Sequence, residues 1–137
     1  MNINKLEWRK NWLGCINELT NLELQKQMWL NQTYRTGPNW NPHWSFIEFM
    51  CSYFDDQLWG KKYDYIISQE LISKDEYDQI KLWHDALDKY SAPKNNDHDD
   101  QAILDDLTWQ EIVKIGKESK QNLAYLLTQD EKEYLQV

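Results

Sequence analysis

The chain has 137 residues, a net charge of −8 and an unusual number of large aromatic side chains, with eight tryptophans and eight tyrosines. This length suits one domain, residues 1–137, which buries roughly two thirds of the surface of its unfolded chain. No apolar run approaches the roughly 18 residues of a membrane-spanning helix, and no charged and then apolar leader opens the chain. We therefore expect a soluble, cytoplasmic protein without a membrane partner.

A helix-start signal recurs along the chain. Ser or Thr followed three residues later by Glu forms a capping box, in which each side chain accepts a hydrogen bond from the other residue's backbone N–H. Each occurrence precedes apolar residues at helical spacing, and this agreement between two signals predicts helices. The five pairs are Thr20 with Glu23, Ser45 with Glu48, Ser73 with Glu76, Thr108 with Glu111, and Thr128 with Glu131.

The apolar spacing divides the chain into helices and connections. No stretch alternates as a strand does, so the predicted fold is all-α, a single-domain bundle of about five to six helices. In chain order, the predicted elements are helices over 3–19, from 20 onward, 45–59, 62–71, from 73 onward and 108–127, with a terminal turn after 128. The two longer connections are 34–43 and 91–100.

The segment GPNWNPHWSFIEFMCSYFDDQLWG, residues 37–60, contains all three phenylalanines of the chain. On a helix its polar residues form one narrow stripe, and apolar residues cover the rest of the circumference. This pattern predicts that 45–59 is the central helix of the bundle, ending at Gly60. Trp40 and His43, which precede the helix, form a secondary candidate site.

Catalytic and metal-binding motifs are missing. His43, His84 and His98 belong to three different predicted elements, and none forms a recognised ligand pair. Cys15 and Cys51 fall in apolar-periodic segments, which favours free, buried thiols over a disulfide. We therefore predict a protein that is not an enzyme and has no metal or cofactor. The alternative is a small metal-dependent hydrolase that uses these histidines with neighbouring carboxylates.

Charge is the most informative feature for function. Residues 1–62 carry a net charge of +1 and residues 63–137 a net charge of −9, and no Lys or Arg occurs between Lys94 and Lys114. An acidic surface suits a basic partner and opposes nucleic-acid binding, which needs Lys and Arg. Trp109 is expected to serve as an aromatic anchor within it. The predicted partner-binding residues are Asp97, Asp99, Asp100, Asp105, Asp106, Trp109 and Glu111.

The acidic stretch and the segment ILDDLTWQEIVKIGKESKQNLAYLL, residues 103–127, resemble bacterial immunity proteins, which neutralise toxins of contact-dependent and related competition systems. The resemblance is to the closing helix of several such families and implies a cognate protein toxin, such as a nuclease with a basic active-site cleft, as the partner. A less specific alternative is an adaptor that binds a partner helix in an exposed groove.

Overall fold

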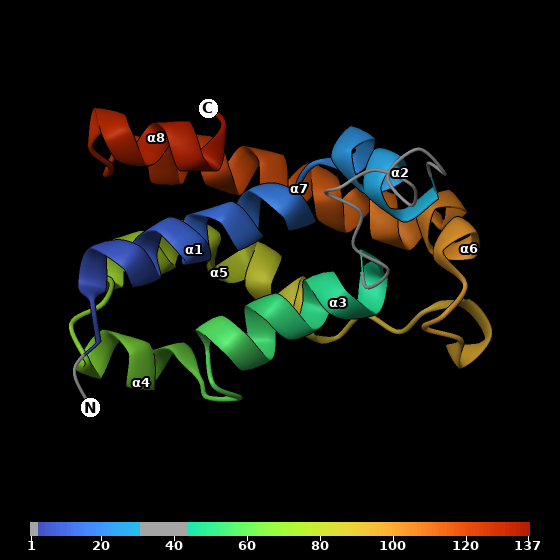
Figure 1. Ribbon diagram of the computed structural model, residues 1–137, viewed down its shortest axis with the longest axis horizontal. Coiled ribbons are helices and arrows are strands. Elements are labelled where there is room, and N and C mark those ends of the chain that lie inside the picture. Colours follow the sequence, from blue (N-terminus) through green and yellow to red (C-terminus); the bar gives the residue numbers. More distant parts are fainter. Residues whose placement is uncertain (1–2, 31–43) are drawn as a thin grey trace, which may run out of the picture.

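The computed structural model describes residues 3–30 and 44–137, and these residues form an all-α fold without strands (Figure 1). The prediction of an all-α bundle is confirmed, with more and shorter helices than expected. The helices are α1 (Lys5–Leu19), α2 (Leu22–Leu30), α3 (Phe46–Cys51), α4 (Tyr63–Ser68), α5 (Lys74–Asp88), α6 (Asp100–Asp105), α7 (Leu107–Ala124) and α8 (Gln129–Leu135). A π-helix, η2 (Ser52–Gln57), continues α3, and a single 3₁₀ turn, η3 (Pro93–Asn95), lies between α5 and α6.

The bundle is built from two helix pairs, α5 along α7 and α1 along α8, with α3 and η2 packed on α1 (Figure 1). Four fully buried tryptophans, Trp12, Trp29, Trp83 and Trp109, dominate the core. Helices α5 and α7 approach closely because Gly116 has no side chain: an added Cβ would lie 2.8 Å from Cδ1 and Nε1 of Trp83 and against the Thr20 methyl group. Both cysteines are free thiols; Cys15 is buried as predicted, whereas Cys51 is only half-buried.

The aromatic segment 45–59 is helical as predicted, but it lies against α1 and does not form the centre of the bundle (Figure 1). Its fully buried side chains lie along one side, whereas the remaining apolar ones are half-buried. The switch from α3 to η2 keeps Tyr53 in the core and leaves Asp55 and Asp56 exposed. Gly60 ends the segment with φ +66°, as predicted, and Trp59 before it also has a left-handed backbone, with φ +55°.

Three of the five predicted helix starts are confirmed. Ser73 and Thr128 each form a complete capping box with the glutamate three residues later. Ser45 caps α3 by accepting a hydrogen bond from the Glu48 N–H at 3.3 Å. In each of the three the side chain of the predicted Ser or Thr itself caps the helix, although Asn41 with Pro42 also competed with Ser45 in the sequence.

The other two predicted caps are wrong because a neighbouring side chain takes their place. Thr20 ends α1, and its hydroxyl donates to the Ile16 carbonyl oxygen at 2.7 Å, while the Asn21 side chain accepts from the Leu24 N–H. Asp106 caps α7 by accepting from the Thr108 N–H at 3.1 Å, so Thr108 is already inside the helix.

This difference predicts unequal effects for two substitutions that are only two positions apart. Asp106→Ala should lower the free energy of unfolding by about 1–2 kcal/mol, because α7 loses its N-cap and the Tyr90 hydroxyl loses its hydrogen-bond acceptor. Thr108→Ala should stay within about 0.5 kcal/mol of the wild type. Urea unfolding of both variants measures the difference, and equal losses would mean that Thr108 is the cap after all.

A buried arginine joins the two complete capping boxes. Arg9 on α1 is only 8 % exposed, and its guanidinium binds both Glu76 and Glu131, the capping-box glutamates of α5 and α8. It also donates to the Leu71 carbonyl oxygen at 3.0 Å, so all five of its N–H groups have acceptors. One cation therefore positions the starts of two helices against α1.

Candidate functional site

The predicted acidic residues lie at one end of the molecule, on the connection before α6, on α6 itself and on the start of α7 (Figure 1). Helix α6 packs there beside α2 and α7. The side chains of Asp97, Asp99, Asp105 and Glu111 are exposed, while those of Asp100 and Asp106 are half-buried. We refer to these six residues as the acidic surface.

Three carboxylates of the acidic surface also build the fold. Asp99 caps α6 by accepting from the Ala102 N–H at 3.1 Å, and Asp106 caps α7 and accepts from the Tyr90 hydroxyl at 2.8 Å. Asp100 accepts from the Phe46 N–H at 3.2 Å, which ties α6 to the start of α3. Replacing any of the three would therefore also disturb a helix start or a tertiary contact.

The other three carboxylates are not used in this way. Asp105 accepts only from Gln101 on the same helix, at 3.2 Å. Asp97 and Glu111 accept no hydrogen bond from any residue in 3–30 or 44–137. Asp97, Asp105 and Glu111 are therefore the positions at which the charge of the acidic surface can be changed with the least effect on folding.

Trp109 is not available as a surface anchor, and that prediction is wrong. Its side chain is 0 % exposed, its Nε1–H donates to Oε1 of the equally buried Gln25 at 2.9 Å, and its ring packs against those of Trp29, Phe46 and Tyr90. Because α7 begins at Leu107 and not at Thr108, the third helical position faces the core.

Leu107 takes the place that was predicted for Trp109. As the first residue of α7 it is 78 % exposed, next to Asp106 and one helical turn before Glu111 on the same face. The sequence contains a signal for this exposure. Leu107 directly follows the capping Asp106, so it is the first helical residue and precedes the residues of α7 that face the core. The acidic surface thus has an exposed apolar side chain among its carboxylates.

The histidines do not assemble into a site. His84 is half-buried on α5, where burial lowers its pKa below the usual value, and His98 is exposed on the connection before α6. Trp40 and His43 lie outside the described residues. Among the residues that the structure does describe, no three His, Cys, Asp or Glu side chains are placed to hold a metal ion. The metal-dependent hydrolase alternative would need such a group.

Within the described part of the chain, no helix combines the length and the apolar character that crossing a membrane requires. No protein-family model matches the chain, and no curated protein or solved structure matches it either.

Proposed function

We propose that the protein is an immunity protein that binds and neutralises a cognate toxin, a nuclease with a basic active-site cleft, through the acidic surface. The observation that carries this proposal is the concentration of six carboxylates at one end of the molecule, with no Lys or Arg between Lys94 and Lys114. Four of the six side chains are exposed.

Charge complementarity gives the physical reason. A nuclease must bind phosphates, so its cleft carries Lys and Arg. An acidic inhibitor approaches such a cleft faster than a neutral one, and the charge pattern fixes the orientation in which it binds. Leu107 supplies an exposed apolar side chain next to Asp106 and one turn before Glu111, which a partner would bury on binding. Inhibition then follows from occupation of the cleft, without catalysis by this chain.

Charge reversal at the three carboxylates that the fold does not use tests the proposal. In Asp97→Lys/Asp105→Lys/Glu111→Lys the net charge changes from −8 to −2, since each reversal adds two charges. With the proposed nuclease toxin as partner, the wild-type association rate should rise as the salt concentration falls. The variant should associate at least about 10-fold more slowly at low salt, because three lysines then balance the three remaining carboxylates and the acidic surface no longer attracts a basic cleft.

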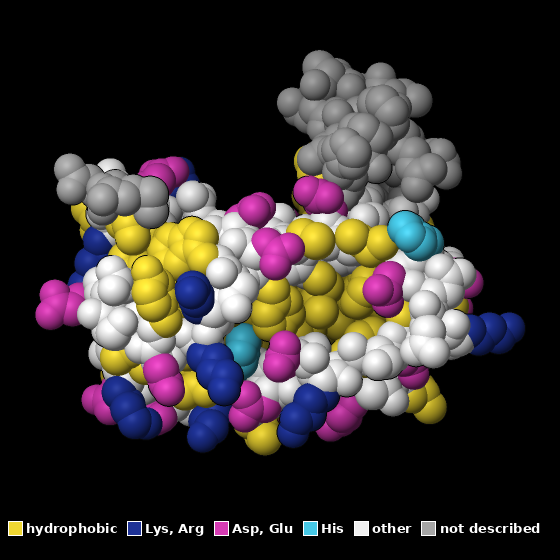
Figure 2. All heavy atoms as spheres, turned by 90° about the horizontal axis from the view of Figure 1, so that it is seen from below, with side chains coloured by type: hydrophobic (Ala, Val, Ile, Leu, Met, Phe, Trp, Pro, Cys, Tyr) yellow, Lys and Arg dark blue, Asp and Glu magenta, His cyan; other side chains and the backbone are white. Residues whose placement is uncertain are grey.

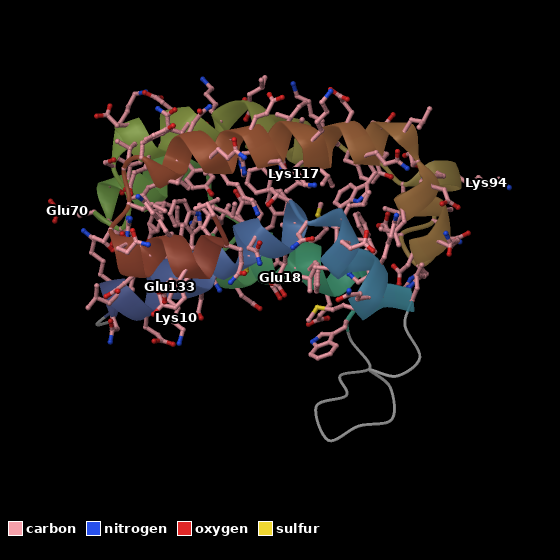
Figure 3. The ribbon with its side chains drawn as sticks, turned by 90° about the horizontal axis from the view of Figure 1, so that it is seen from above. Lys10, Glu18, Glu70, Lys94, Lys117 and Glu133 are labelled. Carbon is pink, nitrogen blue, oxygen red and sulfur yellow. The ribbon has the colours of Figure 1, made fainter. Side chains whose placement is uncertain are left out.

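The matched control reverses three exposed acidic residues elsewhere, Asp64, Glu70 and Glu118, and reaches the same net charge. Glu70 lies at the end of the molecule opposite Lys94, which marks the end with the acidic surface (Figure 3). The control should keep most of the association rate and should still protect cells from the toxin. Equal rates for both triple variants would show that only total charge matters. A folded test variant that binds and protects as the wild type does would overturn the proposal.

A further inference from the structure

A chain of hydrogen bonds crosses the core and ends at His84. Trp12 Nε1–H donates to the Tyr63 hydroxyl oxygen at 2.9 Å, the hydroxyl oxygens of Tyr63 and Tyr53 lie 2.5 Å apart, and the Tyr53 oxygen lies 2.8 Å from Nδ1 of His84. The three residues before His84 are almost completely buried, so water does not share these bonds. Burial raises the pKa of both tyrosines, and their hydroxyls keep their protons at neutral pH.

The order of the protons in this chain follows from its first member. Indole Nε1–H is only a donor, so the Tyr63 oxygen accepts from Trp12. The Tyr63 proton is then donated to the Tyr53 oxygen, and the Tyr53 proton to Nδ1 of His84. If His84 donated through Nδ1 instead, one of the two buried hydroxyl protons would lose its acceptor among the described residues, and a buried donor without a partner disfavours that arrangement.

This order fixes the tautomer of His84. Because Nδ1 accepts, the proton of the neutral imidazole sits on Nε2. No other residue of 3–30 or 44–137 is hydrogen-bonded to Nε2. The ring lines a hollow of about 340 Å³ whose other lining residues are Phe54, Gly60, Lys61, Lys62 and Asp88. The view from below shows this face, with a histidine side chain recessed beside lysine side chains (Figure 2).

We propose that this hollow binds a small oxyanion, a phosphate or carboxylate group, which accepts a hydrogen bond from Nε2–H of His84 and is attracted by the ammonium groups of Lys61 and Lys62. The buried chain holds the histidine as a donor before the ligand arrives, which lowers the cost of ordering the site. Phe54 packs against the imidazole, with ring centroids 5.6 Å apart, and limits its rotation.

The charges around the hollow are compatible with an anion. The two lysines come from the connection between η2 and α4, and they exceed the one lining carboxylate, Asp88 on α5. Asp85 on α5 is the other acidic group that acts on His84, while the side chains that η2 and α4 present to it, Tyr53, Phe54 and Tyr63, are uncharged. This local excess of lysines contrasts with the net charge of −8 of the whole chain.

Histidine nitrogen NMR of the full-length protein tests both parts of the proposal. At pH 7.5 the two-bond nitrogen–proton spectrum should show His84 protonated at Nε2 and bare at Nδ1. Titration with sodium phosphate or with sodium acetate, with chloride exchanged to keep the ionic strength constant, should then give a saturable shift of Nε2 in the millimolar range. Comparing the two titrations shows whether the site prefers phosphate or carboxylate. Phosphate should also raise the pKa of His84, because a bound anion favours imidazolium.

Variants separate a site from general salt effects. Lys61→Met/Lys62→Met should weaken binding at least severalfold while His84 keeps its tautomer, and Lys94→Met, at the far end of the molecule, should bind as the wild type does. Tyr53→Phe should give a mixture of both His84 tautomers and weaker binding. If Tyr53→Phe unfolds, the comparison of Lys61→Met/Lys62→Met with the wild type still tests the proposal. An Nδ1–H tautomer in the wild type, or shifts that are equal in the lysine-pair variant, would overturn the proposal.

Discussion

Replacing Arg9 with alanine is expected to lower the free energy of unfolding by about 3–5 kcal/mol, because it leaves the buried Glu76 carboxylate without its cation. The guanidinium contacts Glu76 and Glu131 at 2.6 Å each, from two different nitrogen atoms. Its removal should therefore weaken the attachment of both α5 and α8 to α1. Urea unfolding followed by circular dichroism measures the loss of stability.

Two controls show that burial causes the effect. Lys74→Ala removes an ion pair on the same helix α5, with Asp78, but both partners are largely exposed and the stability should not change measurably. Arg9→Lys keeps the charge but can donate only three hydrogen bonds where arginine donates five, so it should restore only part of the stability. A loss in Arg9→Ala that is no larger than in Lys74→Ala would contradict a buried clamp.

The pH dependence of Arg9→Ala gives an independent check. Burial alone would raise the pKa of Glu76, but the hydrogen bonds from Arg9 and Ser73 outweigh it and hold the pKa below its usual value. A lowered carboxyl pKa stabilises the folded state above the unfolded value of about 4.3, and this contribution is lost as the pH falls below it. The difference in stability between wild type and Arg9→Ala should accordingly become smaller in acid.

The Arg9 clamp also marks the limit of prediction from sequence. Local signals place the capping boxes at Ser73 and Thr128, because both partners of each box lie within three residues. That one arginine serves both boxes depends on contacts across 67 and 122 residues of sequence, which no local pattern contains. The tyrosine chain to His84 is unpredictable for the same reason, since it joins four elements.

The misplaced start of α7 shows how a small local error alters a site. Thr108 and Asp106 are both good N-cap residues two positions apart, and the capping-box pattern favoured Thr108 because Glu111 follows it. In the structure Asp106, and not Thr108, is the N-cap of α7. The capping roles of Asp99 and Asp106 were not predicted, because both residues were interpreted only as surface charges, although Asp is a common N-cap residue. The concentration of acidic residues at one end was predictable, but the division into structural and free carboxylates was not.

Trp109→Ala is expected to be among the most destabilising substitutions in the chain. A fully buried Trp leaves a large cavity, which costs about 3–5 kcal/mol, and Oε1 of the buried Gln25 loses its donor as well. The Gln25 amide also donates to the Glu18 carbonyl oxygen at 2.9 Å, so the effect extends from α2 to the end of α1. With total stabilities of about 5–15 kcal/mol for such domains, the variant should be close to unfolding at ambient temperature.

Leu107→Ala is the matched surface variant, two residues away on the same helix. With 78 % of its side chain exposed, its loss should change the free energy of unfolding by less than about 0.5 kcal/mol. It should instead speed dissociation of the toxin that we propose as the partner, because the exposed apolar side chain of the acidic surface is gone. Denaturant unfolding and dissociation rates of both variants distinguish the roles. A Trp109→Ala protein with wild-type stability and faster dissociation would assign the anchor to Trp109, and would require α7 to begin where the capping-box pattern placed it.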